Sequence, residues 1–522
     1  MLFNSPDFIL VFLPVTLTGF FLIGRVAGHR PAIIWLACAS VAFYGYWRLE
    51  FLPLLLGSLV FNFLVGRRLA RQASTPLLVF GIVTNLALLG WFKYAGFLAE
   101  SIATLLALDV PIPHIILPLA ISFFTFQQIA FLVDAYDGTS EDPDFWRYAL
   151  FVTFFPHLIA GPLVHHKEML VQFQRPETSR PQPDRMTLGL TLFLIGLFKK
   201  VVLADNLSPV ALDVYGPALD GAVPTLVQGW VGALAYMLQL YFDFSGYSDM
   251  AVGLGLLFGI LLPINFNSPY KAPSIIDYWS RWHMTLTRWI TAYIYNPMVL
   301  ALTKRRLRAG KPLLRRKQAS AGAFLVLLAW PTIATMALAG LWHGAGWQFL
   351  VFGLLHGLYL TINHGWRSIR QRRGIGAETG RLFRPVGVLL TFFCVTVASV
   401  FFKAASVGQA MTMLTGMAGL GPDGSLAELL RLPKLSLILL AGGFAIVWML
   451  PNSVEWLGRD RLGHEPAPVP VPDVPTPRPR WSLGVPRWRP TLAQGIALGV
   501  IGCLTLIQAL SMNPTEFLYF TF

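Results

Sequence analysis

The chain has 522 residues, of which 55% are hydrophobic and 13% are charged, and its formal net charge is +14. A mean hydropathy of +0.59 excludes a soluble protein built around a single core. Apolar runs of the roughly 20 residues that cross a bilayer recur along the whole sequence, which predicts an all-α polytopic membrane protein.

The first predicted helix is an apolar stretch at residues 8–22, without a basic region before it or a small-residue cleavage site after it. We interpret it as a retained helix and not as a cleaved signal. About sixteen apolar segments follow one another, near residues 7–24, 31–47, 51–66, 76–92, 94–109, 115–133, 146–164, 186–203, 223–241, 243–262, 281–300, 321–340, 345–365, 383–402, 435–451 and 491–511. Several are short or broken by proline and glycine, so we expect about 11–13 crossings together with re-entrant pieces.

Basic residues gather in short loops between these segments, at 67–71 (RRLAR), 304–317 (KRRLRAGKPLLRRK) and 367–373 (RSIRQRR). Such loops are retained on the cytoplasmic side, so the positive charge sets the topology and does not indicate nucleic-acid binding. A proline-rich interval at 452–490 is predicted to be a linker, also cytoplasmic, within one membrane domain that covers residues 1–522.

The three cysteines, Cys38, Cys394 and Cys503, stand singly in apolar runs. This spacing suggests neither a disulfide framework nor a zinc site, so we predict no metal site and no thiol-based relay. The sequence does not indicate which residues would bind a cofactor.

Polar residues at membrane depth are costly, and they interrupt the apolar region that begins near residue 239. Asp243 and Asp249 allow two interpretations. In a transporter they would form a Na⁺ or H⁺ site at a broken helix. In an enzyme they would pair with Arg281 or Arg288 and hold a cavity in shape.

The segment around His283 mixes bulky aromatics with charge, in the order Arg281, Trp282, His283, then Arg288 and Trp289. This composition favours a short helix that is buried in protein or lies at an interface over one that faces lipid. The arginines and tryptophans are equally well explained as interfacial anchors. For His283 we favour a functional role.

A second polar stretch lies at 341–366 (LWHGAGWQFLVFGLLHGLYLTINHGW). Its two flanking basic clusters predict a hairpin whose turn, 341–347, lies away from the cytoplasm. His343 is therefore placed at the far end of the hairpin. An imidazole there can take a proton from an attacking hydroxyl, although a buried histidine that only joins two helices explains the spacing equally well.

Two further histidines follow on the returning arm of this hairpin. His356 is thirteen residues beyond His343, more than three helical turns away, so we expect it to have a structural or supporting role. His364 lies near the basic cluster at 367–373 and is predicted to be interfacial.

Taken in order, YFDFSGYSDMAVGLGLLFGI, LPINFNSPYKAPSIIDYWSRWHMTLTRW and LWHGAGWQFLVFGLLHG resemble the membrane-bound O-acyltransferase family, in particular bacterial alginate O-acetyltransferases and their D-alanyl transfer relatives. The resemblance extends to MLFNSPDFILVFLPV, LAISFFTFQQIAFLVDAY, FPHLIAGPLVHHKEMLVQF and the ending NPTEFLYFTF, so it covers nearly the whole chain. It implies a ring of transmembrane helices around a thin centre, crossed by a tunnel.

The resemblance also implies roles for individual residues. The family's catalytic histidine maps onto His343, and its second histidine, in the segment WHMTL, maps onto His283. Relatives commonly carry Arg-Asp shortly after this segment, whereas this chain has Thr291 and Ala292. This difference puts the carry-over of local salt bridges and of acceptor preference in doubt.

The function implied is acetyl transfer from a cytoplasmic thioester, acetyl-CoA, to a hydroxyl acceptor for acetylation of a periplasmic or extracellular polysaccharide such as alginate. We expect His343 to act as the general base and His283 as an orienting or oxyanion-stabilising partner. A periplasmic acetyltransferase partner and a bacterial inner-membrane location follow from the same resemblance. The basic loop 304–317 would hold the nucleotide of the donor.

Three alternatives remain open: transfer of D-alanyl or another small acyl group, an ion-coupled transporter or flippase, and a noncatalytic scaffold. A transporter would move its substrate without a thioester and would depend on an ion gradient. A scaffold would tolerate the loss of His343.

Overall fold

A computed structural model describes residues 1–108, 115–138, 144–314, 320–373, 383–458, 462, 488–511, 515, 517 and 518. Every regular element in these ranges is a helix, which confirms the predicted all-α class. The proline-rich interval 452–490 lies mostly outside the described residues, so its role as a linker stays a prediction.

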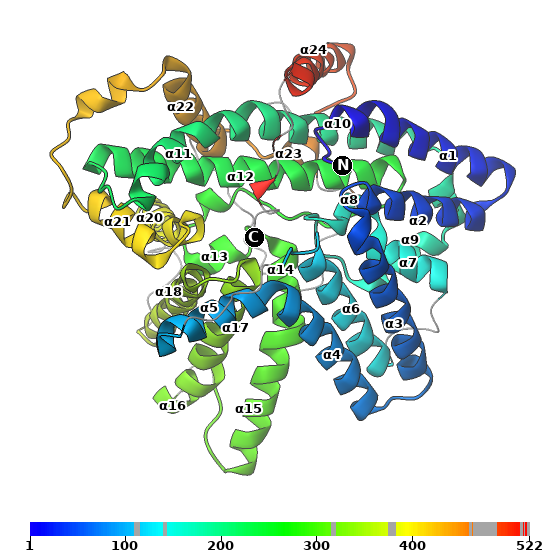
Figure 1. Ribbon diagram of the computed structural model, residues 1–522, viewed down its shortest axis with the longest axis horizontal. Coiled ribbons are helices and arrows are strands. Elements are labelled where there is room, and N and C mark those ends of the chain that lie inside the picture. The colour runs from blue at the N-terminus through cyan, green and yellow to red at the C-terminus, as the bar shows by residue number, and fades with distance from the viewer. Residues whose placement is uncertain are drawn as a thin grey trace.

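The N-terminal third comprises η1 (Asp7–Phe12), α1 (Leu13–Val26), α2 (His29–Gly45), η2 (Leu49–Phe51), α3 (Leu52–Arg71), α4 (Thr75–Leu89), η3 (Gly90–Tyr94), α5 (Ala95–Leu106), α6 (Ile121–Tyr136), α7 (Phe145–Thr153), α8 (Phe155–Leu158) and α9 (His166–Gln174). In Figure 1, α3, α4 and α6 run side by side, and each packs against the other two. Helix α8 has only four residues, all of them buried. Such a short helix is expected here because prolines interrupt the run.

The middle of the chain comprises η4 (Pro176–Ser179), α10 (Pro183–Phe198), η5 (Lys199–Ala204), α11 (Asp205–Leu219), α12 (Leu226–Leu257), η6 (Pro269–Lys271), α13 (Ile275–Trp279), α14 (Met284–Ile290), η7 (Thr291–Tyr295) and α15 (Asn296–Arg308). Helix α12 is mostly apolar and is buried along its C-terminal two thirds, as expected of a central helix. It packs along α10 and α11 (Figure 1).

The last part comprises α16 (Ala321–Phe324), η8 (Leu325–Ala329), α17 (Trp330–His343), α18 (Trp347–Arg372), α20 (Arg384–Lys403), α21 (Val407–Met417), η9 (Leu426–Arg431), α22 (Lys434–Met449), α23 (Ser453–Leu457) and α24 (Leu492–Ser511). Helices α17 and α18 form the predicted hairpin, with residues 344–346 as its turn. In Figure 1, α24 lies at the outer edge of the molecule beyond α10.

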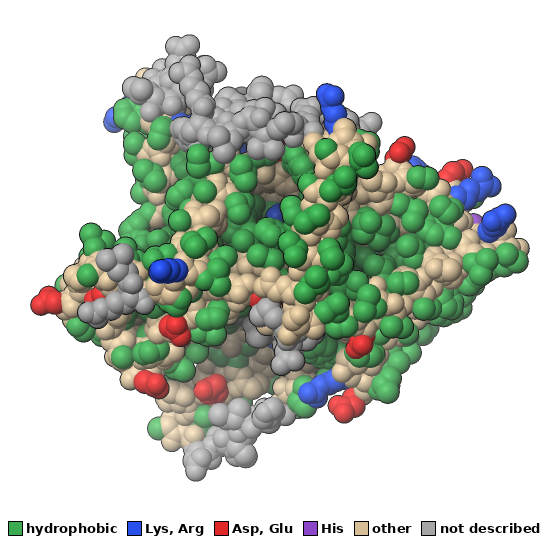
Figure 2. Space-filling model, turned by 90° about the horizontal axis from the view of Figure 1, so that it is seen from above, with side chains coloured by type: hydrophobic (Ala, Val, Ile, Leu, Met, Phe, Trp, Pro, Cys, Tyr) green, Lys and Arg blue, Asp and Glu red, His purple; other side chains and the backbone are tan. Residues whose placement is uncertain are grey.

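Within the described residues, seven helical segments are long and apolar enough to cross a membrane: Asp7–Val26, Leu49–Arg71, Thr75–Leu106, Pro183–Leu219, Ala321–His343, Arg384–Lys403 and Leu492–Ser511. The shorter helix Lys434–Met449 is also apolar. These spans agree with a polytopic membrane protein, and they are fewer than the expected 11–13 crossings because several buried helices are short or carry polar residues. Figure 2 shows a face covered mainly by hydrophobic side chains, as contact with lipid requires.

Candidate functional site

The first candidate residue, His343, is the last residue of helix α17 and its side chain is only 4% exposed. Gly344 continues the chain in an extended conformation, so the helix ends there and the hairpin turns. Aromatic rings surround the imidazole. The centroid of the Trp342 ring lies 4.9 Å from that of His343, and those of Phe402 and Phe352 lie 5.1 and 6.2 Å away.

The hairpin that carries His343 is held together by close backbone contact. A Cβ atom on Gly340 would lie 2.2 Å from the carbonyl oxygen of Phe349, and one on Gly353 would lie 2.3 Å from that of Met336. Both distances are too short for any side chain, so the two helices approach as closely as they do only because these positions lack one. This packing fixes the direction of the helix that ends at His343.

The second candidate residue, His283, precedes helix α14 and is fully buried. Its backbone lies in the left-handed region, with φ of 44°, which costs a non-glycine residue on the order of 1–3 kcal/mol. Asn265 holds this conformation, because its carbonyl accepts from the amide of Met284 at 3.0 Å. Strained backbone of this kind gathers at functional sites.

The side chain of Asn265 also fixes the tautomer of His283. Its Oδ1 atom accepts from the amide and the hydroxyl of Thr285, at 3.2 and 2.9 Å, and lies 3.1 Å from Nδ1 of His283. Nδ1 must therefore donate, which leaves Nε2 as the proton acceptor of the neutral ring. Burial lowers the pKa of His283, which lies outside the seven candidate spans, to about 3, so the ring is neutral.

The structure brings the two predicted histidines together, although 59 residues separate them in the sequence. The centroids of the two imidazole rings are 6.4 Å apart. The ring of Trp342 stacks on that of Phe126, and the ring of Phe126 stacks in turn on that of Trp289. A small reacting group placed beside the two imidazoles would be shielded by apolar side chains from most of the surroundings.

A cavity of about 190 Å³ reaches His343 from one side. Its walls come from five separate parts of the chain: Trp47 and Arg48, Lys93, the segment 116–123, Ile159, and Trp342 with His343. The lining mixes polar and apolar groups. Ala120, on this wall, has a φ of 61° and is a second non-glycine residue in the left-handed region.

Sequence reasoning missed Lys93, whose buried ammonium group lies in this cavity. Its Nζ atom donates to the carbonyl of Trp342 and, at 3.3 Å, to the hydroxyl of Ser122. Lys93 is the only charged residue between Arg71 and Glu100, in the middle of an apolar run. A charge in such a place is a functional signal, and it would have pointed to this residue.

His356 and His364 both lie on helix α18, beyond the turn that follows His343. His356 is buried, accepts from the indole of Trp279 at 3.3 Å and packs against Phe352, which separates it from His343. His364 lies farther along α18, near the basic end of the helix. A supporting role for His356 is consistent with its contacts.

The predicted pairing of the buried acids with arginines is wrong. Asp243 pairs with Lys200 and Asp249 with Lys199, each at 2.6 Å. Arg281, in the turn that follows α13, pairs with Asp277 four residues earlier, at 2.8 Å. Both lysines lie inside the apolar segment predicted at 186–203, and sequence reasoning did not single them out.

Arg288 likewise pairs with neither buried acid. It forms a bidentate salt bridge with Glu168 on helix α9, with N–O distances of 2.8 and 2.9 Å. Its side chain is 32% exposed. The segment 275–290 is otherwise made of two short helices, α13 and α14, with most side chains buried, as its composition predicts.

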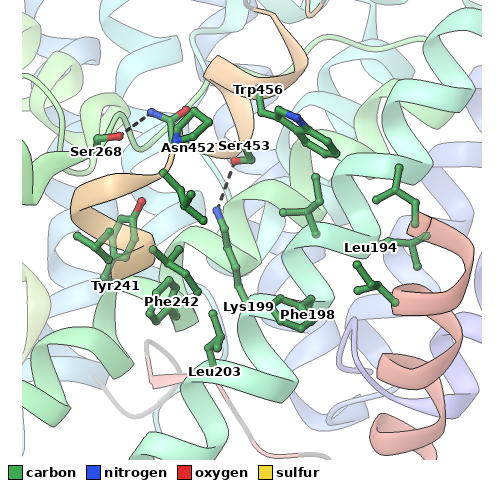
Figure 3. Close-up of a pocket in the computed structure, with 17 residues that line it drawn as sticks. Leu194, Phe198, Lys199, Leu203, Tyr241, Phe242, Ser268, Asn452, Ser453 and Trp456 are labelled. Carbon is green, nitrogen blue, oxygen red and sulfur yellow. Dashed lines mark hydrogen bonds between the residues drawn. The ribbon is translucent and has the colours of Figure 1, made fainter. Parts of the chain in front are cut away.

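A larger and mostly apolar cavity, of about 360 Å³, lies between α10, α12, α22 and α24 (Figure 3). Its lining includes neither His283 nor His343. Lys199 enters from below and donates to Ser453 at 3.3 Å, while Asn452 donates to Ser268 at 2.9 Å (Figure 3). No residue predicted from the sequence to be catalytic lies here.

The basic loop 304–317 lies only partly within the described residues. Arg305, Arg306 and Arg308 form the last turn of α15, where cations favour the negative end of the helix dipole. This position accounts for them without a ligand. A role in holding the donor stays a prediction.

The fold and the site together define a membrane-embedded enzyme whose paired histidines lie beside a cavity. A sequence model of the membrane-bound O-acyltransferase family matches residues 136–311, a range that includes His283 and ends before His343. The chain is 39% identical to the peptidoglycan O-acetyltransferase of Helicobacter pylori, with 80% of each chain covered. It therefore belongs to the membrane-bound O-acyltransferase family, and it is an O-acyltransferase.

Two other relatives span the range of similarity. The chain is 37% identical to a probable alginate O-acetylase of Pseudomonas aeruginosa, over 81% of this chain and 75% of that one. It is 29% identical to a teichoic acid D-alanyltransferase of Bacillus subtilis, over 52% of this chain and 67% of the other. Similarity is thus greater to these two O-acetylating relatives than to the D-alanyl transfer protein.

Proposed function

We propose that this chain transfers an acetyl group from acetyl-CoA to a hydroxyl acceptor, for O-acetylation of a bacterial cell-surface polysaccharide. The observation that carries the proposal is that His343, which lines the 190 Å³ cavity, lies next to His283, with 6.4 Å between the centroids of the two rings. The names of the peptidoglycan and alginate relatives support the acetyl group and the polymer class. Alginate and peptidoglycan remain equal candidates for the polymer.

In the proposed reaction His343 acts as general base. It takes the proton of the acceptor hydroxyl as the oxygen attacks the carbonyl carbon of the thioester. The new ester C–O bond forms, the C–S bond breaks, and the proton passes from the imidazolium to the leaving thiolate. No net proton is gained or lost by the protein.

His283 is proposed to orient the reacting groups. With Nδ1 donating to Asn265, its neutral ring offers Nε2 as an acceptor. It can thus hold an acceptor hydroxyl or the imidazole of His343 in place. A neutral ring of this tautomer has no N–H to direct at an oxyanion, so we favour orientation over oxyanion stabilisation.

The arrangement of the spans supports acceptor entry from the side opposite the basic loops. Leu49–Arg71 begins beside the cavity, and its far end carries the basic cluster 67–71. Ala321–His343 starts after the basic loop 304–317 and ends at the cavity. By the positive-inside rule the cavity then opens to the periplasm, and the site lies in the bacterial inner membrane.

The acceptor hydroxyl belongs either to the polymer or to a periplasmic acetyltransferase that passes the group onward. We propose the second route, because the described residues are helices in one membrane domain and offer no separate module that would grip a polymer.

The test is transfer of labelled acetyl from acetyl-CoA in membranes that contain the native chain, His343→Ala, His283→Ala or His364→Ala at equal abundance. We expect His343→Ala to lose about 100-fold or more, the range of general-base catalysis. His364→Ala serves as the matched control and should retain activity. Elution of each variant in detergent as the native species excludes misfolding.

Unchanged labelling in His343→Ala would contradict its role as the base. Labelling from D-alanyl thioesters but not from acetyl-CoA would replace the acetyl group by D-alanyl within the same family.

A further inference from the structure

We propose that Lys93 and Tyr94 are positioning residues that hold the end of helix α17 and thereby fix His343. The inference rests on the proposed role of His343. It is independent of the identity of the donor and of the acceptor.

Two successive carbonyls at the end of α17 are held by two successive residues of η3. Tyr94 Oη donates to the carbonyl of Leu341 at 2.8 Å, and Lys93 Nζ donates to that of Trp342. His343 follows directly. The π-helical turn η3 is therefore hydrogen-bonded to the last turn of α17, the helix that carries the proposed base.

Physical chemistry explains why this end of α17 needs a partner. The last carbonyls of a helix have no intrahelical donor, and they carry the negative end of the helix dipole. The residue after the helix, Gly344, is extended and has no side chain with which to cap them. The amino group of Lys93 and the phenol of Tyr94 supply the missing donors.

The burial of Lys93 without a carboxylate partner is unfavourable for the stability of the fold taken by itself. Among the ion pairs of the described residues none involves Lys93, and both of its hydrogen-bond acceptors, Trp342 and Ser122, are neutral. Burying a cation without a carboxylate costs free energy that an apolar side chain of similar length would not. The charge is thus best explained by the helix end that it holds.

The π-helical geometry of η3 adds a second observation. π-helical turns are rare and gather at functional sites. η3 interrupts the long segment Thr75–Leu106 at the level of the cavity, and Lys93 is one of the residues that line the cavity. The π-helical turn therefore occurs where Lys93 and Tyr94 form their hydrogen bonds with the end of α17.

If the hydrogen bonds from Lys93 and Tyr94 are lost, we expect the last turn of α17 to fray. His343 would then sample positions away from His283, and a misplacement of about 1 Å costs on the order of 100-fold in rate. Binding of acetyl-CoA on the opposite side would not change. The loss should therefore appear in kcat and not in KM for the donor.

The experiment uses the full chain in lipid nanodiscs, with the variants Lys93→Met, Lys93→Arg and Tyr94→Phe. The matched control is Tyr136→Phe, which removes a tyrosine hydroxyl bonded to Thr75 at 2.9 Å, at the other end of the same helical segment. Hydrogen–deuterium exchange of peptides covering residues 336–346 reports the helix end without any assay of activity. Acetyl transfer gives kcat and KM for acetyl-CoA.

For Lys93→Met we expect exchange of the last amides of α17 to rise about fivefold or more, with the rest of the chain unchanged. The value of kcat should fall about 10- to 100-fold at unchanged KM. Lys93→Arg should recover part of both effects, because a guanidinium also donates to carbonyls. Tyr136→Phe should alter neither.

Two results would overturn the proposal: unchanged exchange at 341–343 in Lys93→Met, or exchange that rises equally throughout the chain. If the native protein transferred no acetyl group, but exchange in Lys93→Met still rose only at 341–343, the role of Lys93 in holding the end of α17 would be supported and the proposed function would be wrong.

Discussion

At the scale of single residues, each of the two histidines depends on a distant side chain: Lys93 donates to the carbonyl of Trp342, next to His343, and Asn265 bonds to Nδ1 of His283. His343 and His283 were found because a polar side chain in an apolar run is unusual and because the motifs around them are specific. Their catalytic roles stay predictions. The side chain of Asn265 contacts that of His283 across 18 residues of sequence, and the side chain of Lys93 contacts the carbonyl of Trp342 across 249, and no local pattern reveals such contacts.

Asn265 gives a prediction at this scale. In Asn265→Ala the donors on Thr285 and on Nδ1 of His283 lose their acceptor, and each buried donor left unsatisfied costs about 1–3 kcal/mol. We expect acetyl transfer to fall at least tenfold and the thermal unfolding midpoint to fall as well.

Asn206→Ala is the control for this prediction, because Asn206 donates only to carbonyls of its own helical segment, at 3.0 and 3.1 Å. Transfer in Asn265→Ala equal to that of Asn206→Ala would show that the tautomer and position of His283 do not matter.

At the scale of elements, the hairpin α17–α18 was predicted from charge alone, since basic clusters flank two apolar arms. The structure confirms the turn. Other elements were less predictable. The pairing of Lys199 and Lys200 with α12 depends on which face of α10 and η5 meets that helix, and this is decided by packing over a distance of about fifty residues.

The close contact within this hairpin gives a second prediction. Gly353→Ala places a methyl group against the carbonyl of Met336, so the helices must separate. Overpacking of this kind costs about 1–3 kcal/mol. We expect a lower unfolding midpoint in detergent and reduced acetyl transfer, since His343 moves with α17.

Gly442→Ala is the matched control, because a Cβ atom at this helical position meets nothing within 4 Å. It should be neutral or stabilising, by up to about 1 kcal/mol, through the higher helix propensity of alanine. Equal effects of the two substitutions would contradict the role of the close contact.

At the scale of the whole molecule, composition sufficed to predict an all-α membrane protein, and the resemblance sufficed for the family. The number of crossings was harder to predict. The sequence pattern gives two apolar segments, 223–241 and 243–262, where the structure has one long helix, α12, which is buried in protein, carries Asp243 and Asp249, and is not among the candidate spans.

The buried ion pairs around α12 give a third prediction. Asp249→Ala leaves the ammonium of Lys199, whose side chain is 12% exposed, without its carboxylate. Removing one partner of a buried pair costs on the order of 3 kcal/mol. We expect a clear fall in the unfolding midpoint, and recovery when Lys199→Met is combined with Asp249→Leu.

The exposed pair of Arg30 and Asp144 provides the comparison. The side chain of Arg30 is 73% exposed, so Arg30→Ala should cost less than about 1 kcal/mol. Equal losses from the two pairs would show that the pair at α12 does not stabilise the fold through its burial.

The π-helical turns have a consequence for comparing genomes. Lys93 lies in one such turn, and Lys199 and Lys200 begin another. Each turn holds one residue more than regular helix needs, and removing that residue rotates everything beyond it by about 100°. A homologue with a one-residue deletion at either place would therefore have these lysines on a different side of the helix. In a sequence alignment, such a single gap would indicate a change in helix geometry.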